Sequence, residues 1–169
     1  MKRIHIIALS SIASIIAISV FSFLDYSKSK LTTNLAQYED DANLVANLVH
    51  SQSRSLLLND AFYLYGKNSE GNVYLSCTSE GDESPLRVEM TEKESGSLKT
   101  VAEKIFPSGD GDTFEGIRVV NELIYFETMD GSMTLVCSKF GNINGIVLDK
   151  GDHLYKVKKD WYEWLSARR

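Results

Sequence analysis

The stretch LTTNLAQYEDDANLVANLVHSQSRSLLL, residues 31–58, has the most regular pattern in the chain. Large side chains recur in it at alternating steps of four and three residues, which is the spacing of one face of an α-helix. These positions are Leu31, Leu35, Tyr38, Ala42, Val45, Val49, Gln52 and Leu56. Acidic and amide side chains fall between them and would face solvent. We therefore predict a long amphipathic helix over residues 31–58.

The width of this apolar stripe indicates what the helix packs against. Leu44 and Leu48 broaden the stripe beyond the narrow seam of a coiled coil. A broad stripe favours packing onto a sheet of the same protein, whereas a narrow seam favours pairing with a second helix. We expect the packing onto a sheet, with dimerisation through the helix as the alternative.

The chain after Ala61 consists mainly of short stretches with a two-residue period, which is typical of strands. These stretches are 61–65, 72–76, 86–90, 116–120, 123–128, 133–138, 143–148 and 154–157. Their connections are short, so neighbouring strands should pair antiparallel. A second helical pattern covers residues 97–106, and the aromatic end 160–169 is expected to cap the sheet. The predicted fold class is α+β, with the long helix on an antiparallel, curled or barrel-like sheet.

An apolar segment precedes this domain. Residues 4–24 contain no Asp, Glu, Lys or Arg and are long enough to cross a bilayer as one helix. Lys2 and Arg3 precede the segment, so the positive-inside rule predicts an exported C-terminal domain. The expected parts are a cytoplasmic tail 1–3, a transmembrane signal-anchor 4–24, a juxtamembrane amphipathic helix 25–58 and an exported β-rich part 59–169. The expected location is the bacterial inner membrane, with the domain in the periplasm.

The same segment contains a face of small side chains. Ser10, Ser14 and Ala17 recur at helical spacing, and such a face lets another membrane helix approach closely. We identify it as a candidate partner-helix face, the alternative being that small residues are merely tolerated there. The segment could also be a cleaved signal peptide, because Ala17 and Ser19 have the spacing of a cleavage site.

The only two cysteines are Cys77 and Cys137. In an oxidising compartment, two cysteines of a small exported domain are expected to form a disulfide. Closing this loop of about 60 residues would stabilise the fold by roughly 4 kcal/mol. The alternative is two buried thiols, because the sequence does not show that the side chains meet.

Composition and histidine placement argue against several chemistries. The net charge of −5 at pH 7 lacks the basic footprint of a nucleic-acid-binding protein, so no direct binding of nucleic acid is expected. His5, His50 and His153 are far apart in the sequence and neighbour no nucleophile motif. We expect no enzyme, no cofactor and no metal site. An exported enzyme is the less favoured alternative, since a fold does not fix a function.

Aromatic residues are spread over the expected strands and the C-terminal end. If the sheet curls, several would line an apolar interior that could hold a small apolar ligand. The alternative is an ordinary packed core. The residues are Phe62, Tyr63, Tyr65, Tyr74, Tyr125, Phe126, Tyr155, Trp161, Tyr162 and Trp164.

Three features follow one another along the chain: the basic pair Lys2-Arg3, the apolar segment 4–24 and the strands after Ala61. This layout resembles that of the small single-pass membrane partners of ToxR-like transcription activators. The group includes ToxS, FidL and the PsaF/MyfF proteins. This resemblance covers the whole chain as a layout and transfers no site residue. It implies a regulatory accessory protein whose periplasmic domain binds and stabilises or modulates a membrane-bound regulator of surface or virulence genes. A minor pilin, a pseudopilin or another envelope assembly component is the alternative.

Overall fold

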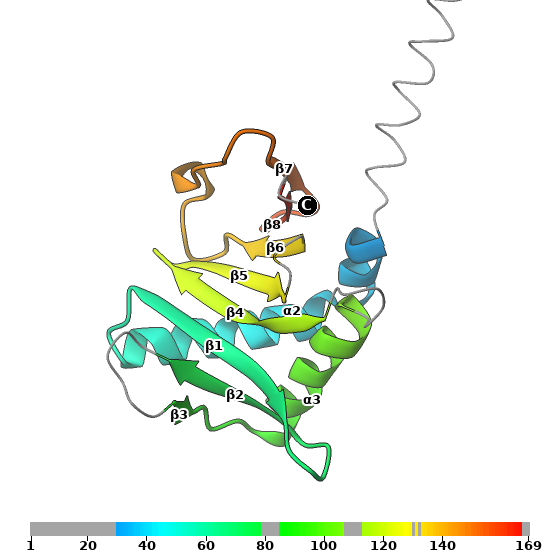
Figure 1. Ribbon diagram of the computed structural model, residues 1–169, viewed down its shortest axis with the longest axis vertical. Coiled ribbons are helices and arrows are strands. Elements are labelled where there is room, and N and C mark those ends of the chain that lie inside the picture. Colours follow the sequence, from blue (N-terminus) through cyan, green and yellow to red (C-terminus); the bar gives the residue numbers. More distant parts are fainter. Residues whose placement is uncertain (1–29, 79–84, 107–112, 130, 132, 167–169) are drawn as a thin grey trace, which may run out of the picture.

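The computed structural model describes residues 30–78, 85–106, 113–129, 131 and 133–166. In these residues two α-helices lie on one face of an eight-stranded antiparallel sheet, with the strand order β3-β2-β1-β4-β5-β6-β8-β7 (Figure 1). The sheet is open, with β3 and β7 as its edges in this part of the chain. The elements are α2 (Lys30–Ser55), β1 (Asp60–Lys67), β2 (Val73–Thr78), β3 (Leu86–Arg87), α3 (Glu92–Thr100), the π-helix η1 (Val101–Ile105), β4 (Phe114–Val120), β5 (Leu123–Thr128), β6 (Met133–Cys137), the 3-10 helix η2 (Ile143–Gly145), β7 (His153–Lys156) and β8 (Trp161–Leu165).

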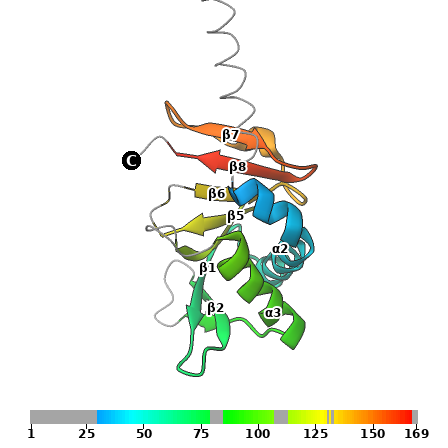
Figure 2. The same ribbon diagram turned by 90° about the vertical axis from the view of Figure 1, so that its right-hand side faces the viewer.

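Helix α2 confirms the predicted amphipathic helix. Leu35, Val45 and Val49 of its stripe are fully buried in the main hydrophobic core. Figure 2 shows α2 and α3 together on one side of the sheet. The stripe is therefore used for packing within the chain, which removes its apolar surface from water.

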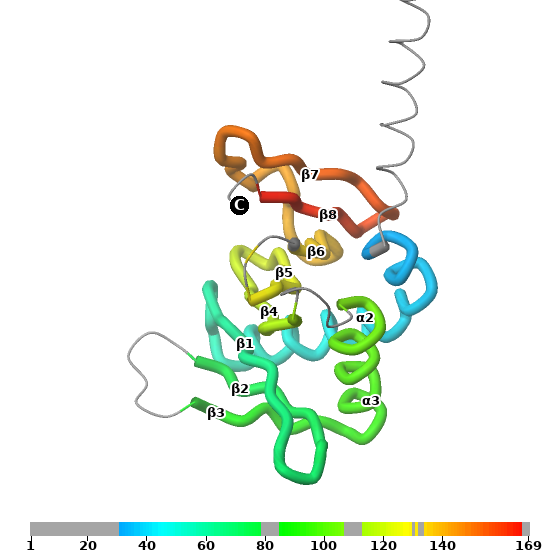
Figure 3. Tube along the Cα trace, turned by 45° about the vertical axis from the view of Figure 1, so that its right-hand side comes forward, coloured from blue at the N-terminus to red at the C-terminus, as the bar shows by residue number. Residues whose placement is uncertain are grey.

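Helix α2 bends at Tyr38, where φ is −119° and ψ is 28°. Before the bend, Thr32 Oγ1 donates a hydrogen bond of 3.1 Å to Glu163 Oε2 in β8. Beyond the bend, the Lys158 ammonium donates to the Glu39 carboxylate. Neither proline nor glycine causes the bend, so contacts on both sides of it hold the two parts in place. Because of the bend, the two parts of the helix run in different directions along the twisted sheet (Figure 3).

Two rows of cross-strand neighbours form the core face of the sheet, under the helices. One row contains Cys77, Tyr63, Ile117, Phe126, Leu135 and Glu163, and the other contains Ala61, Val119, Ile124, Cys137 and Trp161. All of these side chains are buried. Both cysteines thus point toward the helices, on the buried face of the sheet.

The predicted disulfide between Cys77 and Cys137 is nevertheless wrong. Both residues are buried thiols, and three strands lie between β2 and β6. Adjacent strands are about 4.8 Å apart, which separates the two strands by roughly 19 Å. The Cα atoms of a disulfide are usually less than about 7 Å apart. The distance across the sheet therefore prevents the bond.

Among the described residues, only one half of the outer face of the sheet, opposite the helices, is covered by another segment of the chain. The segment 138–152 lays Ile143 and Ile146 on a small second core formed by Leu123, Tyr125 and Val136. A strand was predicted at 143–148, but this prediction is wrong. The Asn142 side chain accepts a hydrogen bond of 3.0 Å from the Asn144 N–H and starts the turn of η2 instead.

The C-terminal end is a strand and not a cap. β8 pairs with both β6 and β7, so it lies between them in the sheet. Trp161 and Glu163 point to the core face, and Tyr162 and Trp164 point to the outer face. The prediction failed because these closely spaced aromatics suit a helix as well as a strand, and because the buried Glu163 hides the two-residue period.

The predicted second helix begins earlier than expected. α3 starts at Glu92 because the Thr91 hydroxyl and the Glu94 carboxylate form a capping box. The helical path then continues through η1 to Ile105. The sequence pattern Thr91-x-x-Glu94 indicates this helix start. No comparable pattern indicates that the helix continues as a π-helix.

The membrane-spanning helix in the predicted fold class is not supported. Within the described ranges, no helix combines the length and the apolar character needed to cross a bilayer. The predicted segment 4–24, with Ser10, Ser14 and Ala17, lies outside the described residues. In the described residues the fold is two α-helices on an open antiparallel sheet, and the predicted location as a single-pass protein of the inner membrane is not supported.

A residue with left-handed backbone follows the last residue of helix α2, Ser55, by two positions. This residue, Leu57, has φ of 56° and is 89% exposed. Its N–H donates to the Arg54 carbonyl over 3.2 Å, and the Leu58 N–H donates to the Ser53 carbonyl over 2.9 Å. This is a Schellman motif, whose left-handed position favours glycine because a Cβ atom is strained there.

We predict that Leu57→Gly raises the free energy of unfolding by about 1 kcal/mol, because it relieves this strain without removing buried contacts. Urea unfolding followed by circular dichroism measures the change. Leu56→Gly is the matched control and should destabilise the protein, since Leu56 does not have positive φ. A Leu57→Gly protein no more stable than the parent would contradict the prediction.

Candidate interaction surface

The half of the outer face that no described residue covers carries a group of large side chains. They are Phe62 and Leu64 of β1, Tyr74 of β2, Arg87 of β3 and Arg118 of β4, and we call them the aromatic–arginine patch. Phe62 stands opposite Arg118, and the Ser76 position neighbours both Leu64 and Arg87. Figure 1 looks onto this face, with α2 behind the strands.

Two glycines let the aromatic rings lie close to the sheet. A Cβ atom on Gly66 would come within 2.4 Å of Cζ of Tyr74, so the ring lies directly over this glycine. A Cβ on Gly116 would be 3.1 Å from Cζ of Phe62 and 2.3 Å from the Tyr63 carbonyl oxygen. Both rings therefore cover backbone of the neighbouring strand, as aromatic residues do when they rescue a glycine in a sheet.

Each arginine of the patch lies over one of these rings. Cζ of Arg87 is 4.9 Å from the centre of the Tyr74 ring, and Cζ of Arg118 is 5.5 Å from that of Phe62. Arg118 also pairs with Glu127, with 3.3 Å between Nε and Oε1. Burial still raises the pKa of Glu127, although Arg118 opposes this. Stacking holds the guanidinium groups in defined positions, which lowers the entropy lost when they bind a carboxylate.

The sequence contains a signal for this patch. The run AFYLY, residues 61–65, has apolar side chains at every position and not only at alternate ones. In an antiparallel sheet with one solvated face, outward positions are normally polar. The exposure of Leu64, at 44%, shows that this run carries apolar groups to the surface.

The expected aromatic-lined interior is filled by packed side chains. Tyr63, Phe126 and Trp161 are at most 1% exposed, and the Phe126 and Trp161 rings are 5.5 Å apart. Tyr125 and Trp164 lie on the other side of the sheet, in the second core. Most of these aromatics are thus divided between two packed cores, whereas Phe62 and Tyr74 belong to the aromatic–arginine patch.

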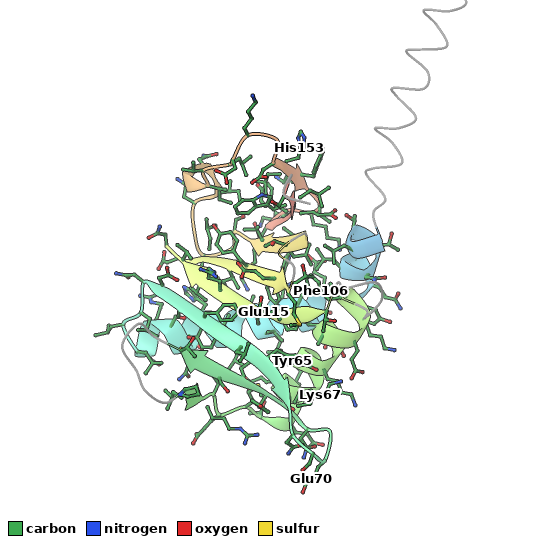
Figure 4. All side chains as sticks on the ribbon, in the orientation of Figure 1. Tyr65, Lys67, Glu70, Phe106, Glu115 and His153 are labelled. Atoms are coloured by element: carbon green, nitrogen blue, oxygen red, sulfur yellow. The ribbon has the colours of Figure 1, made fainter. Side chains whose placement is uncertain are left out.

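The histidines are not brought together. His153 lies at one end of the molecule, beside Tyr155 in the edge strand β7 (Figure 4). His50 lies on α2, stacked on Phe140, and His5 is outside the described residues. Among the described residues, no three His, Cys, Asp or Glu side chains are grouped so that they could hold a metal ion.

Two ionisable groups in the core have strongly shifted proton affinities. Burial raises the pKa of the Cys137 thiol to about 11, and burial raises the pKa of Tyr63 to about 12. The Tyr63 hydroxyl lies 2.6 Å from the Ser53 hydroxyl of α2, which joins the helix to the sheet. Both groups are therefore protonated in the folded protein at neutral pH.

We predict that the free energy of unfolding falls as the pH rises above about 9. The thiol has an ordinary pKa of 9.0 and the phenol one of 10.0, so the unfolded chain loses these protons at lower pH than the folded protein does. The stabilisation that these two protonated groups contribute is complete below pH 9. It is lost as the pH rises toward the raised pKa values of about 11 and about 12. Urea unfolding at several pH values measures this slope.

The variant Cys137→Ala should reduce the slope between pH 9 and 11. Ile124→Val is the matched control: Ile124 faces Cys137 across the sheet, and its replacement should lower stability without changing the slope. Equal slopes for the parent and Cys137→Ala would show that the thiol does not contribute.

Comparisons of the chain with protein-family models, with curated protein sequences and with solved structures find no match. A family assignment therefore does not follow from similarity. The features that point to a function are the uncovered face of the sheet and the charged and aromatic groups arranged on it.

Proposed function

We propose that this chain is an accessory protein that binds a partner protein through the aromatic–arginine patch and acts by stabilising or modulating that partner. The observation that carries this proposal is the unequal coverage of the sheet. Helices cover its core face and the segment 138–152 covers one half of its outer face. The other half presents Phe62, Tyr74 and two arginines, which are residue types enriched at protein interfaces.

The chemistry of the patch favours a partner with carboxylates placed among apolar side chains. Arg87 makes no ion pair within the described part of the chain, so its charge is available to a partner. Leu64 and the faces of the two rings offer apolar area beside the guanidinium groups. An arginine–carboxylate pair formed next to buried apolar contacts gives both affinity and orientation.

A transcription regulator of surface or virulence genes is the partner that the resemblance in layout implies. We include it in the proposal as the expected identity of the partner. An envelope assembly component would use the same kind of surface, and identification of the bound protein distinguishes the two.

We predict that Arg87→Glu lowers the affinity for the partner about tenfold or more, because it places a carboxylate against carboxylates. The partner is first isolated by crosslinking the full chain in its native cells, followed by mass spectrometry. It is then purified and titrated calorimetrically against each variant. Phe62→Ser should weaken binding as well, since it removes the ring beneath Arg118.

Lys159→Glu is the matched charge reversal, in the β7–β8 turn at the other end of the sheet. It should leave the affinity at the parent value. Circular dichroism checks that every variant is folded. A partner that binds Arg87→Glu and Phe62→Ser as tightly as the parent would show that the patch is not the binding surface.

A further inference from the structure

A second feature lies away from the patch, where the C-terminal end of α2 meets the β4–β5 turn. A pocket of about 400 Å³ is located there, and it contains no residue of the patch. Helix α2 contributes His50 and Arg54, and the turn contributes Asn121 and Glu122. The volume is within the range of small-molecule sites, about 300–1,000 Å³.

Residues with positive φ are concentrated around this pocket. Leu57, Asn121 and Glu122 have φ of 56°, 49° and 65°, and among the described residues they are the only non-glycine residues with positive φ. All three line the pocket. Such angles are normal for the two-residue turn at 121–122 but not for a leucine at the end of a helix. Strain of this kind clusters at binding sites, and here it places an exposed apolar side chain at the rim.

His50 has a ring nitrogen without a hydrogen-bond partner among the described residues, beside the same pocket. This nitrogen, Nε2, is buried. The nearest carboxylate oxygen, Oε1 of Glu122, is 4.0 Å away. The ring is fixed by stacking on Phe140, with 3.8 Å between the centres and 6° between the planes. Burial lowers the pKa of His50, which favours the neutral form of the ring.

The pocket also holds one charge of each sign. Arg54 and Glu122 do not pair with each other, and Arg54 makes no ion pair with any residue that the structure describes. Both charges act on His50, so they lie near the same ring. Leu58 and Val119 add apolar surface beside them. A ligand that satisfies this set carries a carboxylate, an ammonium and an apolar group.

We propose that this pocket binds a free α-amino acid with an apolar side chain. Arg54 holds the carboxylate, and Glu122 together with Nε2 of His50 accepts hydrogen bonds from the ammonium. The side chain lies against Leu57, Leu58 and Val119. This site is independent of the aromatic–arginine patch, so either proposal can fail without the other.

Titration of the full chain with L-leucine, followed by amide shifts in NMR spectra, tests the proposal at concentrations up to about 10 mM, where even millimolar binding is visible. Isocaproate lacks the ammonium and isoamylamine lacks the carboxylate. We expect leucine to shift the amides of residues 57–59 and 119–122 and to bind at least about tenfold more tightly than either analogue. Absence of these shifts, or equal binding of an analogue, would overturn the proposal.

Variants separate the two charged contacts from general effects on the fold. Arg54→Gln and Glu122→Gln should each weaken leucine binding about tenfold, whereas the matched controls Lys159→Gln and Glu70→Gln should not change it. Leu57→Gly should bind leucine more weakly although its melting temperature rises. A merely structural role of Leu57 would not lower affinity in a more stable protein. Affinities at the parent level in both charge variants would also overturn the proposal.

Discussion

The burial of the apolar stripe of α2 against the core face of the sheet is the interaction on which the rest of the structure depends. Val45 and Val49 of the helix and Tyr63 and Ile117 of the sheet are fully buried in one core. Loss of this contact would expose that core face. Because the helix occupies it, any further partner has to use the outer face or the edges of the sheet.

This same helix, the first element of the described chain, is joined to the last one, strand β8. Its first turns contact Glu163 in β8, and Glu39 just beyond the bend holds Lys158 before that strand. β8 in turn completes the sheet between β6 and β7. The C-terminal strands therefore fix the path of α2, and the bend at Tyr38 is the result. Contacts so distant in sequence also make the fold depend on the whole chain.

Local patterns in the sequence predicted the helix and the consecutive hairpins, because each depends on neighbouring residues. The four–three spacing from Leu31 onward predicted the helix, and the two-residue periods after Ala61 predicted most of the strands. Strand order depends on pairing between distant segments, which no local pattern contains. For this reason the sequence did not predict that β8 lies between β6 and β7. It did not predict the distance between Cys77 and Cys137 either.

Local sequence patterns also indicate part of the aromatic–arginine patch. The unbroken apolar run at 61–65 indicated that β1 brings large side chains to both faces. Arg87 and Arg118 are distant in sequence and meet this run only through the sheet register. The pocket beside His50 depends on positive φ at Leu57 and on a turn from another hairpin. The conformation of Leu57 has no sequence signal, because leucine does not normally adopt positive φ.

The central claim is that the uncovered half of the outer face is where a partner binds. Hydrogen–deuterium exchange of the full chain, alone and in complex with its isolated partner, tests this claim most directly. Slower exchange on binding is predicted for peptides that contain β1, β2 and β3, with the segment 138–152 unchanged. Slower exchange confined to the segment 138–152 or to β7 and β8, with none in β1 to β3, would contradict it.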